Sequence, residues 1–313
     1  MKLLHKIRNI LGIEMASGFK EKDFEILKTI AEHILLASNQ LMVLSNRNIQ
    51  SLRRKLSTLE KQGYILAQLH QFGRGRGRPD RIFSLTKQGI GILKSEGVIA
   101  ENILDEKVLA ESISAVDHQM MINWFRVHLV YLEKIISRLK IQFLSCSSPF
   151  LPETESGHCF IQDFAIDATS RKSFIPDGVF IITDTIENKS LLFFLEADCG
   201  SESLASAERH IKDVRQKIIN YGAYFDKLGY KRYEESWNCR FNGFRLLFIT
   251  NALSRLNNLC RLVREMPPSD FIWLTQNQAV FKEGVSGKIW VSGGNMESSR
   301  QSILGSLCQT SNI

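Results

Sequence analysis

The sequence lacks long apolar runs and paired cysteines, and each absence excludes a class of protein. Its longest apolar stretches, such as LLFFLEA, are far too short to span a bilayer. Residues 1–18 have no apolar core long enough for a signal peptide, so we expect a short amphipathic helix there, with Met15 as a second candidate start. The six cysteines are scattered without a CxxC pair, which argues against a zinc site and a disulfide scaffold. These absences predict a cytoplasmic protein that does not associate with a membrane.

The glycine-rich stretch HQFGRGRGRPDRIF, residues 70–83, also lacks the features of a nucleotide-binding loop. A P-loop ends in Gly-Lys followed by Ser or Thr, which is missing here, and a dinucleotide-binding fingerprint opens a helix, whereas here a strand pattern follows. The letters RGRP match the core of an AT-hook, whose arginines enter a narrow minor groove. An AT-hook is normally a free segment, however, and this one lies between two predicted strands. We interpret it as the tip of a hairpin whose arginines contact phosphates or a minor groove, with a solvated turn as the alternative.

What the chain does have is a globular composition and a local excess of positive charge. Its 313 residues, 44% of them hydrophobic and 23% charged, are enough for two domains. From Lys20 to Gly97 there are fourteen Lys and Arg against seven Asp and Glu, an excess equal to the net charge of +7 of the whole chain. A local basic excess is typical of proteins that bind a polyanion. The alternative is an ordinary solvated basic face.

Residues 20–97 have the pattern of a winged helix-turn-helix domain, in which three helices precede a two-stranded hairpin. Apolar residues recur at helical spacing in the first and third helices, and Gly63 is a natural end for the third. In this arrangement the third helix enters the major groove and the hairpin tip contacts the backbone or a minor groove nearby. The predicted elements are helices over 23–36, 39–44 (capped by Ser38 or Asn39) and 49–63, strands over 64–72 and 81–85, and a final helix within 85–97.

The third helix and the hairpin tip supply the predicted DNA contacts. Arg53 and Arg54 lie off the apolar stripe of this helix, so they are available to phosphates and bases. The alternative is that they are ordinary surface charges on an amphipathic helix. The predicted contacts to double-stranded DNA are Arg47, Arg53, Arg54, Lys55, Arg74, Arg76, Arg78 and Arg81.

Residues 98–140 are interpreted as linker helices between two domains. The segment 118–139 is long, apolar and aromatic, and we expect it to pack on the second domain. His118 and His128 lie within it, but neither has an acid or a histidine three or four residues further on. Both are therefore predicted to be structural histidines rather than metal ligands.

From about residue 141 short strands alternate with helices, which predicts an α/β domain with a mixed sheet. Its chemistry is concentrated at strand ends, where Asp177 follows a proline and Glu196 ends the next strand, nineteen residues later. If the two strands pair as a hairpin, the carboxylates meet, and adjacent carboxylates favour a hard divalent cation such as Mg²⁺. Such an ion polarises a scissile phosphate and lowers the pKa of an attacking water. Asp177 and Glu196 are the predicted metal ligands, with acids that only cap strand ends as the alternative.

The order PD…ExD resembles the PD-(D/E)XK nuclease superfamily, with Asp198 where that pattern has a lysine. In some relatives the lysine lies on the following helix, where this chain offers Lys212 and Lys217, and Lys217 shares a helix face with Tyr221. The resemblance implies a catalytic set in which two acids bind the metal, a third acid ligates it or accepts a hydrogen bond, and a lysine stabilises the transition state. The alternative is a nuclease-like fold that binds DNA without cutting it. The implied catalytic residues are Asp177, Glu196, Asp198 and Lys217.

The chain from roughly residue 20 to 280 resembles the replication-relaxation family of plasmid and other mobile-element proteins. The similarity is carried by the segments FSLTKQG, DHQMMIN, IPDGVF, FLEADCGSES, KIINYGAYF and FRLLFIT. It implies an α/β fold, α+β overall, with a winged helix-turn-helix followed by a restriction-endonuclease-like domain, which we place at 141–295. The remaining residues, 296–313, are expected to be a disordered tail. An acidic residue commonly precedes the PD hairpin, and the candidates here are Glu153 and Glu155. The matching positions are Asp177, Glu196, Asp198, Gly200, Lys217, Tyr221 and Arg255.

The resulting hypothesis is a DNA-binding protein of a plasmid or mobile element that acts in replication, relaxation or transfer. Cleavage by a Mg²⁺-dependent endonuclease or nickase site is one form of it, and a relaxase or replication protein is the expected partner. The first alternative is a non-catalytic accessory factor or transcriptional regulator with the same fold. The second is a winged-helix protein-interaction module without a DNA role, which the basic excess argues against.

Overall fold

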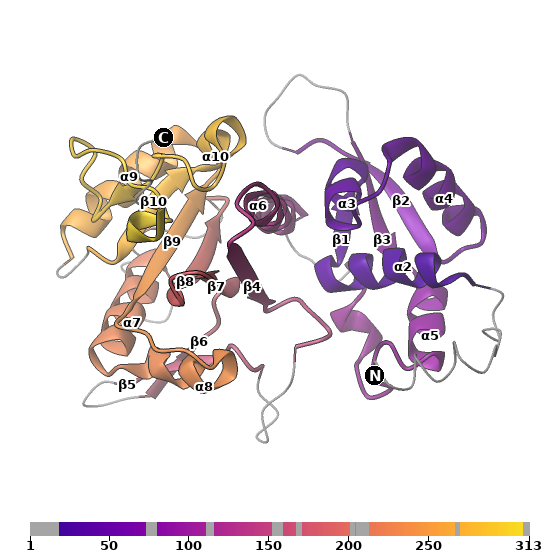
Figure 1. Ribbon diagram of the computed structural model, residues 1–313, viewed down its shortest axis with the longest axis horizontal. Helices are drawn as coiled ribbons and strands as arrows, with labels where there is room; N and C mark the ends of the chain where they lie inside the picture. Colours follow the sequence, from indigo (N-terminus) through magenta and orange to yellow (C-terminus); the bar gives the residue numbers. More distant parts are fainter. Residues whose placement is uncertain are drawn as a thin grey trace. The chain divides into compact units, whose positions relative to one another are not determined.

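The described part of the chain forms two compact units in the computed structural model (Figure 1). One comprises the described residues up to 70 and from 80 to 110, and the other comprises residues 71 and 72 and those from 116 onward. None of the described helices is both long enough and apolar enough to cross a membrane. The structure describes residues 19–72, 80–110, 116–151, 159–166, 171–200, 204, 213–266 and 270–308.

The first unit has the order of a winged helix-turn-helix, which confirms the predicted fold. Its three strands form one antiparallel sheet in the order β1-β3-β2, with β3 in the centre. The β2–β3 hairpin is the wing, and its tip lies outside the described residues. The elements are α2 (Glu21–His33), β1 (Leu35–Ala37), α3 (Ser38–Leu44), α4 (Ile49–Lys61), β2 (Ile65–His70), β3 (Asp80–Leu85) and α5 (Lys87–Ser95).

Helix α4 is defined by its N-terminal cap and by its buried face. The side chain of Asn48 caps it by accepting a hydrogen bond of 2.9 Å from the backbone N–H of Gln50. Leu52, Leu56 and Leu59 are buried along one face, which fixes the helix against the rest of the unit. The opposite face of α4 is therefore left to solvent.

Two local predictions in this unit are wrong. The first predicted helix, over 23–36, wrongly included the residues of β1. Helix α2 ends at Ile34, which has φ +64°, and the next three residues are buried and pair with β3. A run of three apolar residues gives no periodicity to separate a strand from a helix end. The cap of α3 is Ala37 rather than Ser38 or Asn39, since the Gln40 side chain accepts a 2.8 Å hydrogen bond from the Ala37 N–H.

The second unit is built on a six-stranded mixed sheet in the order β11-β10-β9-β8-β7-β4, which confirms the predicted α/β class. Strands β4, β7 and β8 pair antiparallel, β8, β9 and β10 pair parallel, and β11 returns antiparallel. A separate hairpin joins β5 and β6. The elements are α6 (Val116–Ile135), β4 (Leu139–Ser145), β5 (Asp163–Ile166), β6 (Arg171–Phe174), β7 (Gly178–Asp184), β8 (Lys189–Asp198), α7 (Val214–Asp226), η3 (Gly229–Arg232), α8 (Tyr233–Trp237), β9 (Phe244–Thr250), α9 (Leu253–Arg264), β10 (Ile272–Gln276), α10 (Asn277–Glu283), β11 (Val291–Ser292) and η4 (Gly305–Cys308).

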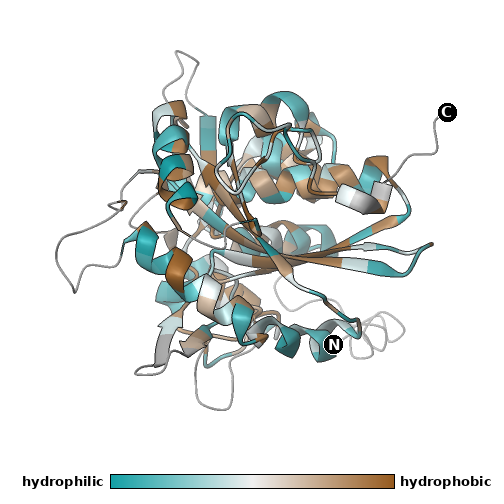
Figure 2. Cartoon of the chain, turned by 90° about the vertical axis from the view of Figure 1, so that its left-hand side faces the viewer, coloured by the Kyte–Doolittle hydropathy of each residue, from teal (hydrophilic) through white to brown (hydrophobic). Residues whose placement is uncertain are grey.

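Both faces of this sheet are covered, so its central strands are hydrophobic along most of their length (Figure 2). Residues that alternate along a strand point to opposite faces. Val179 on β7 packs in the cluster that includes residues of α7 and α9, whereas Phe180 packs in the cluster that includes residues of α6 and α10. The sheet therefore lies between two helical layers, and polar residues are left to the strand ends.

The predicted domain limits differ from the structure at two places. The segment 98–140, predicted as a linker, is divided: its described residues up to 110 belong to the first unit, and α6 belongs to the second. The tail predicted to be disordered over 296–313 is folded in its described part, 296–308, where Gln301 forms a bridge with Trp290. Ile303 and Leu304 are also buried in the core of the second unit.

The two glycines of α5 give a matched test of the packing of the first unit. A Cβ on Gly89 would lie 2.2 Å from the backbone oxygen of Tyr64, whereas a Cβ on Gly91 would meet no atom within 4 Å. We expect Gly89→Ala to destabilise the first unit by about 1–3 kcal/mol through overpacking. Gly91→Ala should stabilise it by about 0.5–1 kcal/mol, because it stiffens the unfolded chain in a helical position.

Hydrogen exchange of α5 peptides along a urea series measures both effects. Tryptophan fluorescence is the internal control, because all four tryptophans lie in the second unit and its transition should not move. Equal effects of the two substitutions would contradict the close approach of Tyr64 to Gly89.

Candidate functional site

Three acidic side chains gather where β7 begins and β8 ends. The antiparallel pairing places Gly178 opposite Leu195, so Asp177 and Glu196 lie at the same end of the hairpin. The backbone N–H of Asp177 donates to the Leu195 carbonyl at 3.1 Å. Its Oδ2 in turn accepts a 2.7 Å hydrogen bond from the N–H of Ala197. The predicted hairpin is confirmed, and it fixes Asp177 directly against the strand that carries Glu196.

Glu196 is held by two residues of α7. Only 3% of its surface is exposed, and its Oε1 accepts a 2.7 Å hydrogen bond from the Tyr221 hydroxyl. Lys217 Nζ donates to the other oxygen, Oε2, at 3.1 Å. Asp213 caps α7 by accepting from the N–H of Gln216 at 2.8 Å, which sets the position from which both side chains reach the strand. The helix face that the sequence predicts for Lys217 and Tyr221 is thus directed at Glu196.

The pKa of the Glu196 carboxyl is raised to about 7. Burial is the main cause, since it removes the hydration of the charged form, and the charge of Asp177 adds to it. Lys217 and the Tyr221 hydrogen bond act in the opposite direction and favour the carboxylate. A further cation near Glu196 would therefore stabilise its charged form and lower its pKa.

Asp198, which stands in place of the expected strand lysine, is paired with Arg255 of α9. The Arg255 Nε lies 2.7 Å from Asp198 Oδ2, and Oδ1 accepts a 2.7 Å hydrogen bond from the N–H of Gly200. Gly200 has φ +80°, a conformation that favours glycine and that turns its N–H back to the carboxylate. The carboxylate of Asp198 is 8% exposed, and both of its oxygens have protein partners.

His118 of α6 also belongs to this cluster, although no pattern in the sequence indicates its contact with Asp177. Its Nε2 lies 3.1 Å from Asp177 Oδ2. Burial alone would lower the pKa of His118, but the hydrogen bond and charge of Asp177, together with the charge of Glu196, raise it overall. Its partner is 59 residues away in sequence, so a search at helical spacing could not find it. The contact with Asp177 is compatible with the predicted structural histidine, and it places His118 beside the carboxylates.

The prediction for His128 agrees with its environment. Its ring contacts Phe281 edge-on at 5.6 Å, and burial lowers its pKa. This histidine is part of the packing between α6 and α10.

A small cavity of about 30 Å³ lies within the cluster, with His118, Glu196, Asp198 and Lys217 in its wall. This is about the share of liquid volume that one water molecule occupies. The cavity therefore has room for a single water or metal ion beside the carboxylates, and anything larger must approach from outside.

Some of the predicted DNA-contacting residues of the first unit are exposed, and others form ion pairs within the protein. Arg53 and Arg54 are exposed on α4, opposite its buried stripe. Arg47, Lys55 and Arg81 each form an ion pair, with Glu25 at 2.6 Å, Asp23 at 2.7 Å and Glu60 at 2.7 Å respectively. Arg74, Arg76 and Arg78 lie outside the described residues.

The sequence pattern of a family described as replication-relaxation matches residues 27–234, two thirds of the chain and all of the hairpin, α4 and α7. This chain belongs to the replication-relaxation family. The match confirms the resemblance inferred from the sequence segments. It covers the winged helix and the carboxylate cluster up to Tyr221, while Arg255 lies beyond it.

Solved structures with some similarity to this replication-relaxation protein belong to the MarR group. A mutant MarR from E. coli complexed with operator DNA is 16% identical over 37% of this chain and 74% of that one, with a TM-score of 0.23. The zinc-responsive MarR family member ZitR from Lactococcus lactis is 18% identical over 43% of this chain and 95% of that one, with a TM-score of 0.24. At this level the similarity carries no argument about function. No curated protein matches the chain.

The donor set of this replication-relaxation protein suits a hard divalent cation. Glu196 lines the small cavity, and the charge of Asp177 contributes to the raised pKa of Glu196, so added positive charge is favourable there. Among the described residues no group of three or more His, Cys, Asp and Glu could hold an ion. Mg²⁺, however, is usually bound by one or two carboxylates and completes its shell with water and phosphate oxygens. The candidates Glu153, Glu155 and Lys212 lie outside the described residues.

The Asp198–Arg255 pair gives a test of the geometry of the site. We expect Arg255→Gln to destabilise the second unit by about 3 kcal/mol, because it leaves a buried carboxylate without its cation. Asp198→Asn combined with Arg255→Gln should cost less than the two single substitutions together, with a coupling of about 1–3 kcal/mol. Urea unfolding followed by tryptophan fluorescence measures all four proteins of the cycle. Additive effects would show that Asp198 and Arg255 do not stabilise the fold through their contact with each other.

Proposed function

We propose that this replication-relaxation protein binds double-stranded DNA through its winged helix, with α4 in the major groove. The observation that carries the proposal is the division of α4 into two faces. Leu52, Leu56 and Leu59 are buried, while Arg53 and Arg54 are exposed and have no ion pair within the described part of the chain. Free guanidinium groups on the third helix of a winged helix are suited to contact phosphates and guanine edges.

The charge distribution supports the same proposal. The basic excess of the chain lies between Lys20 and Gly97, the span that holds α2 to α5. A field of this kind attracts a polyanion and raises its rate of association. We further propose that the bound DNA belongs to a plasmid or other mobile element, and that a relaxase or replication protein acts with this one.

The contribution of α4 can be measured from the salt dependence of DNA binding. Each phosphate contact that is lost should reduce the slope of log K against log salt by about 1. We expect Arg53→Gln combined with Arg54→Gln to reduce the slope by about 2 and to weaken binding at 0.1 M salt. Fluorescence anisotropy of a labelled duplex over a salt series gives both values.

Lys87 supplies the matched control, because it is an exposed cation of the same unit but begins α5. Lys87→Gln should leave the slope unchanged. If the α4 variant behaved like this control, α4 would not be the helix that faces DNA.

A second proposed activity is cleavage of a DNA strand by a metal-dependent reaction at Asp177 and Glu196. It is supported by the contact of Glu196 with Lys217 at a cavity of about 30 Å³ and by the position of Asp177 against the same strand end. A bound Mg²⁺ would polarise the scissile phosphate and lower the pKa of the attacking water. Asp177 and Glu196 are the residues that would hold it.

The remaining residues of the cluster act on these ligands and on the phosphate. Tyr221 fixes one oxygen of Glu196 and so sets the direction of the carboxylate. Lys217 lies at the other oxygen, where its charge can stabilise the negative charge that grows on the phosphate. Asp198 is engaged with Arg255, and its proposed contribution is to hold the end of β8 in place.

The alternative is a non-catalytic accessory factor or transcriptional regulator with the same fold. It is favoured by one observation, that the position of the strand lysine is taken by Asp198, whose carboxylate is already neutralised by Arg255. In that case the cluster would serve stability, and DNA binding by the first unit would be the whole activity.

Cleavage of supercoiled plasmid in the presence of Mg²⁺ or Mn²⁺ separates the two proposals. We expect nicked product from the parent protein and at least a hundredfold slower nicking by Asp177→Asn, because one metal ligand is lost. Affinity for the same DNA without metal should be unchanged.

Glu297→Gln is the control, since Glu297 is exposed after β11 and does not line the cavity of the cluster. It should nick at the parent rate. Absence of metal-dependent nicking by the parent would leave the accessory factor, and full activity of Asp177→Asn would reject the site.

A further inference from the structure

A large open pocket lies at the opposite end of the central sheet from the carboxylate cluster. It has a volume of about 1080 Å³ and is lined by the first residues of β8, β9 and β10 and by the segment after α8. Strand β8 runs from Lys189 at this pocket to Asp198 at the carboxylates, a distance of about 30 Å at 3.3 Å per residue. The two sites are therefore separate, and the cluster of acids does not explain this pocket.

Arg245 on β9 is the unusual residue of the pocket. Its guanidinium lies 4.5 Å from the ring centroid of Trp273, and a Cβ added to Gly305 would be 3.6 Å from its Nη2. The side chain is half-buried, and burial lowers its pKa. Within the part of the chain that the structure describes, no carboxylate pairs with it.

Three other arginines of the second unit are paired with an acid, whereas Arg126 lies over the Phe143 ring and Arg300 contacts the Met296 sulfur. Arg138 lies 3.3 Å from Asp184, and Arg255 lies 2.7 Å from Asp198. Arg232 is likewise paired with Asp163. Burial of a charge without a partner is costly, and the ring of Trp273 offsets only part of that cost. Arg245 thus has the environment of a cation whose partner is a ligand rather than a side chain.

The rest of the lining indicates what kind of anion would fit. Phe225 and Phe271 are partly exposed and stacked at 5.0 Å, and they add an apolar surface to the lining on the face of the sheet opposite to Arg245 and Trp273. Lys189 and Arg240 add positive charge at the rim, where Asp226 and Asp270 add negative charge. The amide side chains in the wall, suited to hydrogen bonds with base edges, are Asn188, Asn238, Asn242 and Gln301.

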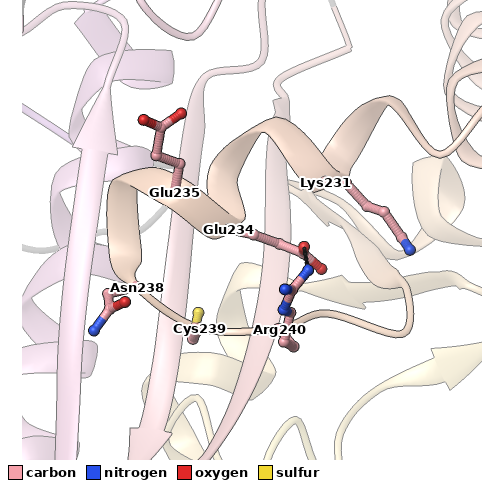
Figure 3. A pocket seen from close by; sticks show the side chains of 6 residues that line it. All are labelled: Lys231, Glu234, Glu235, Asn238, Cys239 and Arg240. Atoms are coloured by element: carbon pink, nitrogen blue, oxygen red, sulfur yellow. Dashed lines mark hydrogen bonds and ion pairs between the residues drawn. The ribbon is translucent and has the colours of Figure 1, made fainter.

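The rim cations are less suited than Arg245 to select a ligand. Arg240 is 92% exposed and bonded to Glu234 at 3.1 Å, in the smaller polar pocket that shares Asn238 and Cys239 with the large one (Figure 3). Lys189 is exposed and lies 3.7 Å from Glu187. Arg245 is the lining cation that is half-buried, lies over the Trp273 ring and has no carboxylate partner among the described residues.

We propose that this pocket binds a nucleotide, with a phosphate on Arg245 and the base against the aromatic surface of Phe225 and Phe271. A nucleotide combines the two chemistries that the lining offers, an anion and a flat ring with polar edges. The volume is at the upper end of ordinary ligand pockets and is sufficient for it. Two sources carry the same chemistry, a free nucleotide and a nucleotide of a single DNA strand, and the test includes both.

Isothermal titration of the full chain with deoxyadenosine monophosphate, inorganic phosphate and an eight-nucleotide single strand tests the proposal. We expect Arg245→Gln to weaken nucleotide binding at least tenfold. Arg261→Gln is the matched control, because it removes an exposed arginine of α9 outside the pocket lining, and it should stay within twofold of the parent. Binding of the monophosphate supports a free nucleotide as the source, and binding of the strand alone supports a strand.

A second variant separates recognition of the base from recognition of the charge. Phe271→Leu keeps Arg245 and should weaken the monophosphate severalfold while leaving inorganic phosphate unchanged. Since Arg245→Gln removes a charge that burial penalises, its thermal stability should equal or exceed that of the parent. Failure of both nucleotide and strand to bind, or equal affinity of Arg245→Gln and Arg261→Gln, would overturn the proposal whatever the outcome of the plasmid-nicking assay.

Discussion

Glu196 is fixed at the end of a central strand with 3% of its surface exposed, where its charge loses most of the hydration it would have in water. The surrounding elements supply hydrogen bonds and positive charge that replace this lost hydration. Helix α7 brings a lysine and a tyrosine to its two oxygens, and the β7–β8 hairpin holds Asp177 in place through backbone hydrogen bonds. Helix α6 adds His118 on the far side of Asp177. The site is a set of buried acids whose charges are balanced by cations from three different helices.

Much of this arrangement could be predicted from the sequence, because it follows from local patterns. Amphipathic spacing marked α2, α4 and α7, and the winged helix followed from the order of those patterns. The acids could be placed together because a short connection between two apolar strands makes a hairpin, and its register puts residue 177 beside residue 196. The helix face shared by Lys217 and Tyr221 required only a separation of four residues.

The parts that could not be predicted depend on contacts between distant segments. His118 meets its partner through the packing of α6 on the sheet, and no spacing within α6 announces it. Strand β1 is three residues long and is defined by its pairing with β3, which lies more than forty residues away. The structure of residues 296–308 depends on the bridge between Gln301 and Trp290, and the polar composition of this segment does not indicate it. Each was missed because its cause is tertiary.

The sheet also has a consequence for the order in which the protein folds. Strands β7 and β8 are joined by a short turn, so they can pair early at little entropic cost, and this pairing alone brings Asp177 to Glu196. The cation for Asp198 comes from 57 residues further along the chain and requires a parallel crossover to β9 before it arrives. Two carboxylates are thus assembled before the charge that balances the third is in place. We expect the repulsion between Asp177 and Glu196 at this end of the hairpin to slow the folding of the second unit, and dissolved salt or a divalent cation to reduce this effect.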